Sequence, residues 1–259
     1  MTFIPRKRFS QHFLRDKEMV HRIITALDPK PHEHLVEIGP GQGALTFPIL
    51  ENTHELEAIE LDRELVALLQ AHDKKIGNLQ IHSADVLTFN FADLKQDERL
   101  LRIFGNLPYN ISTPLIFHLL SFTSIIADML FMLQKEVAWR LAARVNTKQY
   151  GRMSVMVQYH CHVEVLFDVP ADAFYPVPQV CSSIVRLVPH RQAPYFVKDY
   201  AFFAKIVKLA FGQRRKTLRN SLKDLIDDDC WMRFQLSSGL RPENLTVKDF
   251  VEFSNQLGQ

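Results

Sequence analysis

Methylation of an exocyclic amine requires groups that occur together in the segment Asn106-Leu107-Pro108-Tyr109. An adenine amino nitrogen is a poor nucleophile, because its lone pair is delocalised into the ring. Two acceptors, the Asn106 side-chain oxygen and the Leu107 backbone carbonyl, can bind its two hydrogens and direct the lone pair toward a methyl donor. Pro108 would fix the turn, and Tyr109 could stack on the base. An ordinary turn at the end of a strand is the alternative interpretation.

A glycine-rich turn, Gly39-Pro-Gly-Gln-Gly43, contains three of the nine glycines of the chain. Glycine adopts positive φ angles and lets a ligand approach the backbone closely. Because position 44 is Ala and position 45 is Leu, the dinucleotide-binding pattern GxGxxG is not met. The turn alone is therefore a weak indication of a nucleoside ligand, and Gly39 and Gly41 are its candidate contacts.

Two carboxylates follow the next predicted strands. Glu60 lies 21 positions after Gly39, where an acidic side chain can accept both ribose hydroxyls of an adenosine. Asp85 follows the third strand and can meet an adenine edge. No lysine of the P-loop kind follows the glycines, so the acidic pocket suits a cation such as the sulfonium of S-adenosylmethionine rather than phosphates. A surface carboxylate or a helix cap is the alternative for each acid alone.

These residues need a sheet that brings strand ends together. Short apolar segments alternate with helical patterns over residues 20–135, which predicts an open α/β sheet of parallel strands. The predicted strands are 34–38, 56–61, 79–82 and 100–104, with late strands at 154–160 and 184–188. Helices are predicted to end at Asp28-Pro29 and to cover 45–50 and 65–71. Since such sheets bind ligands at the carboxyl ends of their strands, we expect the candidate residues to meet there.

The chain after residue 190 has a different pattern. Residues 188–198 contain Pro189 and Pro194 and have the composition of a linker. An apolar stripe at helical spacing follows, interrupted by Gly212; its members are Phe203, Ile206, Val207, Ala210, Phe211, Leu218, Leu222 and Leu225. The predicted domains are therefore residues 1–190, with a basic arm at 1–15, and a helical domain at 191–259.

The net charge of +2 conceals two basic blocks. Residues 1–22 carry six basic and two acidic side chains, and residues 198–223 carry eight and one. The intervening segment 23–197 has 14 basic and 19 acidic side chains, and residues 224–259 have three and seven. This asymmetry indicates that the two blocks bind a polyanion. Solvated surface is the alternative.

Several classes of protein are disfavoured by the sequence. No apolar run approaches the ~18 residues of a membrane span, and no apolar segment follows the charged N-terminus as in a secretory signal. The three cysteines have no paired spacing, and the pairs His32/His34 and His160/His162 lack a third ligand, so no metal site is predicted. We therefore expect a soluble, cytoplasmic protein without a membrane partner, and nothing demands more than a monomer.

The sequence resembles the KsgA/RsmA family of ribosomal RNA adenine N6,N6-dimethyltransferases over almost its whole length. The segments that carry the resemblance are 6–15 (RKRFSQHFLR), 36–46 (VEIGPGQGALT), 59–62 (IELD), 106–113 (NLPYNIST), 174–182 (FYPVPQVCS) and 211–220 (FGQRRKTLRN).

The resemblance implies a class I (Rossmann-like) S-adenosylmethionine-dependent methyltransferase sheet with a small helical C-terminal domain. The implied substrate is two adjacent adenosines in the 3′-terminal hairpin of small-subunit (16S) rRNA within a 30S precursor particle, each methylated twice. The implied cofactor-binding residues are His12, Leu14, Gly39, Gly41, Glu60, Asp85 and Asn106, although the family usually has Asn where His12 stands. Phe174 would be a second stacking face for the flipped adenine, opposite Tyr109, with core packing as the alternative.

An RNA backbone is then the expected partner of the basic blocks. Arg215, Arg219 and Lys223 are spaced i, i+4, i+8 and would share one helical face. The predicted RNA-binding residues are Arg6, Lys7, Arg8, Lys205, Lys208, Arg214, Arg215, Arg219 and Lys223.

Three functional hypotheses remain open at the level of sequence. The first is the small-subunit rRNA adenine dimethyltransferase. The second keeps the chemistry but changes the substrate to large-subunit rRNA or DNA. The third is a ribosome-assembly factor whose RNA binding matters more than its catalysis.

Overall fold

The computed structural model describes residues 11–73, 77–213, 216–226, 231, 237 and 239–257. They divide into two compact units, of which the first comprises residues 1–138 and 164–189 and the second comprises 139–163 and 190–259. The assignment of separate functions to residues 1–190 and 191–259 stays a prediction.

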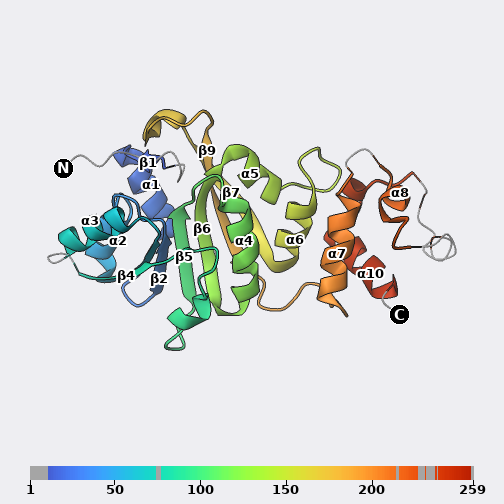
Figure 1. The fold of residues 1–259 in the computed structure, drawn as a ribbon, viewed down its shortest axis with the longest axis horizontal. Coiled ribbons are helices and arrows are strands. Elements are labelled where there is room, and N and C mark those ends of the chain that lie inside the picture. Colours follow the sequence, from blue (N-terminus) through green and yellow to red (C-terminus); the bar gives the residue numbers. More distant parts are fainter. Residues whose placement is uncertain are drawn as a thin grey trace. The chain divides into compact units, whose positions relative to one another are not determined.

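A seven-stranded sheet forms the centre of the first unit (Figure 1). Its order is β4-β3-β2-β5-β6-β9-β7. The strands are β2 (His34–Ile38), β3 (Glu55–Glu60), β4 (Asn78–Ser83), β5 (Leu101–Asn106), β6 (Ile126–Gln134), β7 (Cys161–Val169) and β9 (Ser182–Pro189). Strands β2 to β6 run parallel, whereas β9 runs antiparallel to β6. The four early strands and β9 confirm the sequence prediction; β6 and β7 were not predicted.

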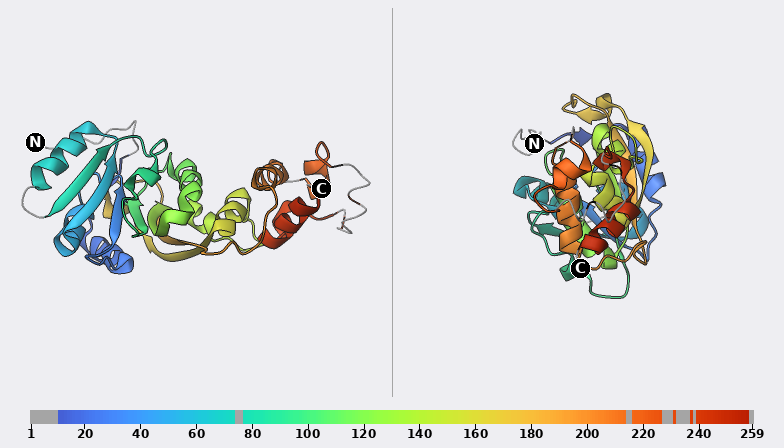
Figure 2. Two further views of the ribbon diagram at one scale, coloured as in Figure 1. Left: turned by 90° about the horizontal axis from the view of Figure 1, so that it is seen from below. Right: turned by 90° about the vertical axis from the view of Figure 1, so that its right-hand side faces the viewer.

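Helices cover both faces of this sheet (Figure 2). They are α1 (Lys17–Leu27), α2 (Thr46–Thr53), α3 (Arg63–Asp73), α4 (Ser112–Leu119) and α5 (Lys135–Leu141). Helix α1 begins where the Asp16 side chain accepts a hydrogen bond from the Met19 amide at 3.0 Å, and it ends at Asp28, which has a left-handed φ of 49°. This end agrees with the boundary predicted at Asp28-Pro29.

A second, two-stranded antiparallel sheet is formed by β1 and β8. It pairs β1 (Phe13–Leu14) with β8 (Phe174–Tyr175), in the register Phe13↔Tyr175 and Leu14↔Phe174. Residue patterns do not predict this pairing, because the two segments are 160 residues apart in the chain.

The predicted strand at 154–160 is wrong, since this segment forms α6 (Arg152–His160). Six of the nine residues of α6 are buried, five of them consecutive, and so long a buried run obscures the helical periodicity and resembles a short buried strand. The helix start is fixed by Ser154, whose hydroxyl accepts from the Gly151 amide at 3.1 Å and donates to the Arg140 carbonyl at 2.6 Å. The strand proper, β7, begins after it at Cys161.

The second unit is largely helical in the part of the chain that the structure describes. Besides α6 it contains α7 (Tyr200–Ala210), α8 (Leu218–Leu222) and α10 (Val247–Leu257). The predicted apolar stripe forms its core, because Phe203, Ile206 and Val207 are fully buried and pack with α10 residues such as Phe250.

The predicted helical face running from Arg215 to Lys223 needs correction. Thr217 is extended (φ −66°, ψ 158°) and caps the start of α8, its hydroxyl accepting from the Asn220 amide at 3.4 Å. Helix α8 therefore begins at Leu218, whose amide donates to the Leu240 carbonyl at 2.7 Å. Arg219 lies on this helix and Lys223 directly follows its last residue, Leu222, whereas Arg215 lies outside the described residues.

Within the described ranges, no helix has the length and apolar character needed to cross a membrane.

Candidate active site

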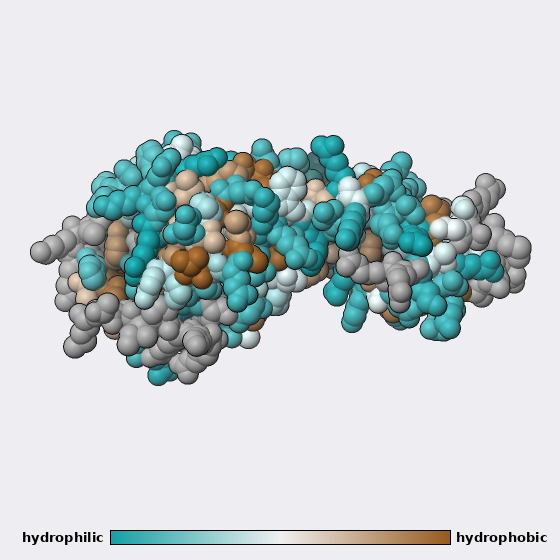
Figure 3. Space-filling view, turned by 90° about the horizontal axis from the view of Figure 1, so that it is seen from above, coloured by the Kyte–Doolittle hydropathy of each residue, from teal (hydrophilic) through white to brown (hydrophobic). Residues whose placement is uncertain are grey.

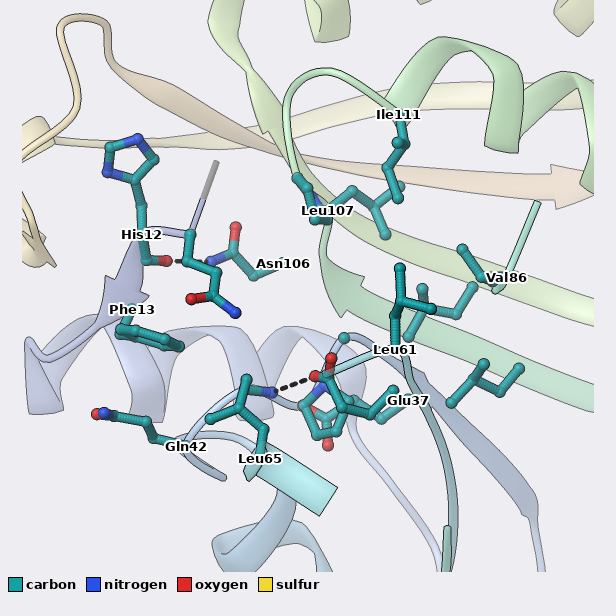
Figure 4. Close-up of a pocket in the computed structure, with 18 of the residues that line it drawn as sticks. His12, Phe13, Glu37, Gln42, Leu61, Leu65, Val86, Asn106, Leu107 and Ile111 are labelled. Atoms are coloured by element: carbon teal, nitrogen blue, oxygen red, sulfur yellow. Dashed lines mark hydrogen bonds between the residues drawn. The ribbon is translucent and has the colours of Figure 1, made fainter. Parts of the chain in front are cut away.

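The carboxyl ends of β2, β3, β4 and β5 meet around one pocket in the first unit, shown in Figure 4. All predicted cofactor-binding and catalytic residues except Phe174 line it: His12, Leu14, Gly39, Gly41, Glu60, Asp85, Asn106, Leu107, Pro108 and Tyr109. The pocket lies where the strand order reverses between β2 and β5, which is the position at which α/β sheets bind ligands.

The glycine turn after β2 forms the floor of the pocket. Gly39, Gly41 and Gly43 have φ angles of 66°, 57° and 84°, a backbone conformation that residues other than glycine rarely adopt. A Cβ atom at Gly41 would lie 3.2 Å from the Phe13 ring, so a larger residue would press on β1. The turn therefore presents backbone, and not side chains, to the pocket.

Glu60 and Asp85 end β3 and follow β4 as predicted. Glu60 is only 8% exposed, and its carboxylate accepts from the Asp62 amide at 2.8 Å and the Gly41 amide at 3.3 Å. Burial raises the pKa of Glu60, although these amides act in the opposite direction. Asp85 is exposed, and its carboxylate accepts from the Leu87 amide at 2.9 Å.

Glu37 also lines the pocket, and the sequence analysis missed it. It is 2% exposed and accepts a 2.6 Å hydrogen bond from the Thr46 hydroxyl. Burial raises the pKa of Glu37 to about 8, with a further contribution from Glu60, against the effect of the Thr46 hydrogen bond. The available signal was a carboxylate two positions before Gly39 and a threonine three positions after Gly43.

The Asn106 amide is oriented by the N-terminal segment. Its Nδ2 donates to the His12 backbone carbonyl at 2.9 Å, the contact drawn as a dashed line in Figure 4. A carbonyl can only accept, so the nitrogen must face His12 and the Oδ1 atom keeps its acceptor capacity for another partner. Next to it, Leu107 is buried, with its amide donating to the Met132 carbonyl at 3.2 Å.

Tyr109 and His12 both line the pocket and lie against each other. Their rings stack with a centroid distance of 5.6 Å and an interplanar angle of 27°. The Tyr109 hydroxyl hydrogen-bonds to the Ser182 hydroxyl at 2.9 Å, and His12 Nδ1 donates to the Pro176 carbonyl at 2.7 Å. The His12 ring points away from Asn106 in Figure 4, so His12 meets the Asn106 amide with its backbone.

The stacking face expected of Phe174 is not present in the structure. Phe174 is 3% exposed and belongs to the hydrophobic core, with its backbone paired to Leu14. The pairing of β8 with β1 turns this side chain inward, and it does not line the pocket. The surroundings of Phe174 therefore agree with the alternative interpretation, core packing.

The basic residues are only partly described. Lys205 and Lys208 lie exposed on α7, Arg219 lies exposed on α8, and Lys223 is exposed directly after α8. Arg6, Lys7, Arg8, Arg214 and Arg215 lie outside the described residues. Among the residues that are described, no three His, Cys, Asp or Glu side chains form a group that could hold a metal ion.

Comparison with known sequences gives a match over nearly the whole chain. Residues 3–259 match the family described as "Ribosomal RNA adenine dimethylase". The chain is 50% identical over 258 residues to Ribosomal RNA small subunit methyltransferase A of Chromohalobacter salexigens, covering 98% of this chain and 92% of that protein. It is also 50% identical over 252 residues to the protein of the same name from Pseudomonas putida, covering 97% and 94%.

Solved structures show the same fold. A dimethyladenosine transferase from Plasmodium falciparum superposes with a TM-score of 0.77 at 25% identity, covering 93% of this chain and 96% of that one. The 23S rRNA methyltransferase ErmE gives a TM-score of 0.71 at 22% identity, covering 95% and 100%, which shows a shared fold only. The predicted class I methyltransferase fold is thereby confirmed.

Proposed function

Because the chain belongs to the ribosomal RNA adenine dimethylase family, we propose that its substrate is the small-subunit rRNA. The target is two adjacent adenosines in the 3′-terminal hairpin, each of which receives two methyl groups on N6. The relatives at 50% identity are named for the small subunit, which favours this substrate over large-subunit rRNA. The protein then acts as a monomer on a 30S precursor particle in the cytoplasm.

S-adenosylmethionine fits the residues of the pocket as the methyl donor. The glycine turn leaves backbone exposed at Gly39 and Gly41, and Glu60 offers a buried carboxylate beside it for ribose hydroxyls. Asp85 follows the next strand, where it can meet an adenine edge, and His12 and Leu14 also line the pocket. When bound, the cofactor supplies an electrophilic methyl group on a sulfonium, whose positive charge is favoured by the carboxylate of Glu60.

The observation that carries the proposal is the orientation of Asn106. With Nδ2 held by the His12 carbonyl, Oδ1 can accept one hydrogen of the target amine. The Leu107 carbonyl, at the turn before Pro108, accepts the second, and Tyr109 stacks on the base. Both acceptors draw electron density onto the nitrogen and fix its lone pair toward the donor. No strong base is needed, because the methylated nitrogen is acidic and loses its proton to water.

Transfer of labelled methyl groups tests this function. Purified protein is incubated with S-adenosylmethionine and unmethylated 30S particles, 50S particles or DNA. We expect incorporation into 30S particles alone, ending at four methyl groups per particle on two adjacent adenosines. Incorporation into 50S particles or DNA, with none into 30S particles, would reject the small subunit as substrate.

A further inference from the structure

The β1–β8 ribbon presents one large aromatic side chain to solvent beside the pocket. Tyr175 is 48% exposed, whereas its neighbour Phe174 and its cross-strand partner Phe13 are 3% and 8% exposed. The following loop, gold beside β1 in Figure 1, adds Val177 at 61% and Val180 at 44% exposure. On the face shown in Figure 3, hydrophobic side chains form limited patches among hydrophilic ones. An exposed aromatic ring followed by two exposed valines, all within residues 175–180, is therefore unusual.

Arg15 covers one side of this ring. Its guanidinium carbon lies 4.0 Å from the centroid of Tyr175, and its backbone amide donates to the Ala173 carbonyl at 2.8 Å. No carboxylate of the described residues lies within ion-pair distance of Arg15. A guanidinium that stacks through its flat face keeps its N–H edge available, and that geometry matches a phosphate.

The ring is fixed close to the residues that bind the target base. Pro176, directly after Tyr175, accepts the hydrogen bond from His12 Nδ1, and the His12 ring stacks on Tyr109. Tyr175 is thus the neighbour of Pro176, which contacts the pocket residue His12. The backbone of Tyr175 is also held by its pairing with β1.

We propose that Tyr175 and Arg15 form a second nucleotide site, in which the nucleobase next to the target adenosine stacks on Tyr175 and its phosphate binds Arg15. The inference rests on the proposed function and deepens it. A target adenosine that enters the pocket has left its stack, so its neighbour loses a stacking partner as well. An exposed ring with an adjoining cation replaces that partner without reading sequence, as in other single-strand binding sites. A protein partner would use the apolar loop but would not need the guanidinium edge.

The test measures the affinity of each variant for unmethylated 30S particles by filter binding, over a range of salt concentrations. Tyr175→Ala removes the ring, Tyr175→Phe keeps it, and Arg15→Gln removes the charge. Val180→Ala is the matched control, because it removes exposed apolar surface from the same loop without touching the ring. Thermal unfolding and calorimetric binding of S-adenosylmethionine show whether each variant is folded with an intact cofactor pocket.

We expect Tyr175→Ala to weaken 30S binding by roughly 5- to 100-fold, the loss of one stacked base. Tyr175→Phe and Val180→Ala should bind like the wild type, and Arg15→Gln should lower the salt slope by about 0.7, the contribution of one single-strand phosphate. Wild-type affinity of Tyr175→Ala, or an equal loss in Val180→Ala, would overturn the site. Binding needs no turnover, so this outcome is distinct from a wild-type protein that binds 30S particles but fails to methylate them, which would overturn the proposed function instead.

Discussion

At the scale of single residues, the proposed chemistry depends on the orientation of the Asn106 side-chain amide. Asn106 could present either its oxygen or its nitrogen to a substrate, and the His12 carbonyl decides between them by accepting from Nδ2. Because the backbone of position 12 makes this contact, the contact does not depend on the His12 side chain. The ring is then used elsewhere, on Pro176 and Tyr109.

Replacing Asn106 with Ala should strongly slow methyl transfer while leaving RNA affinity intact. Loss of one preorganised acceptor is expected to lower kcat by about 10²- to 10³-fold. Single-turnover transfer to 30S particles, with filter binding as the control, measures both quantities. A variant that retained more than a tenth of the wild-type rate would show that Oδ1 is not an acceptor of the target amine.

Glu37 is the second residue whose surroundings determine its chemistry. Burial raises its pKa to about 8, so the folded protein holds this proton more tightly than the unfolded chain does. The resulting stabilisation is complete below the ordinary glutamate pKa and is lost as the pH rises toward about 8.

Glu37→Gln should therefore flatten the pH dependence of stability. The glutamine stays neutral at every pH and can still accept from the Thr46 hydroxyl. We expect the unfolding free energy of the wild type to decline relative to that of the variant between pH 5 and about 8, as measured by urea denaturation. Parallel curves for the two proteins would contradict the raised pKa.

At the scale of elements, the position of Asn106 depends on how closely β5 approaches β2. A Cβ atom at Gly105 would lie 2.2 Å from the Ile38 carbonyl oxygen, which belongs to the neighbouring backbone. Backbone in a central strand cannot move aside without breaking the ladder on which the strand ends depend. Glycine at position 105 is thus a requirement of the sheet that carries the site.

Gly105→Ala should destabilise the protein by about 3 kcal/mol or more, because overpacking against backbone has no local relief. Chemical denaturation measures the loss. The matched control is Gly151→Ala: its Cβ would meet only the Gln149 carbonyl at 4.0 Å, and its φ of −168° suits any residue. We expect this control to stay within about 1 kcal/mol of the wild type. Equal stabilities for the two variants would mean that β5 can shift away from β2.

At the scale of the whole molecule, the basic residues of α7 and α8 belong to a different unit from the pocket. The pocket belongs to the first unit and is lined by carboxylates, whereas the described basic residues of α7 and α8 belong to the second. On the proposed function, this distribution predicts that basic residues of α7 and α8 contact the RNA outside the pocket.

Neutralising Lys205, Lys208 and Lys223 to Gln should weaken RNA binding and reduce its salt dependence. Each lost phosphate contact lowers the slope of log affinity against log salt by about 0.7–0.9. Lys248→Gln is the control, since Lys248 is paired with Glu252 at 3.5 Å on α10. Filter binding to 30S particles at several salt concentrations gives the slopes. An unchanged slope in the triple variant would place the RNA elsewhere.

The sequence by itself determined where the early strands lie along the chain and which residues follow them. Strands β2 to β5 were predicted because each is a short apolar run followed by a turn, and such signals are local. Parallel strands with crossover helices then require Gly39, Glu60, Asp85 and Asn106 to meet at one edge, since their carboxyl ends share it. The pocket confirms that this set of residues comes together.

Only the tertiary structure decided which side chains are buried and how they are oriented. The sequence left both stacking and core packing open for Phe174, and the structure pairs this residue with Leu14, 160 residues away, in the core, with Tyr175 exposed. The burial of most of α6, which obscures its helical periodicity, and the pKa of Glu37 are likewise properties of the tertiary structure. Burial and hydrogen-bond partners are set by contacts between distant segments, and a local pattern of residue types does not contain them.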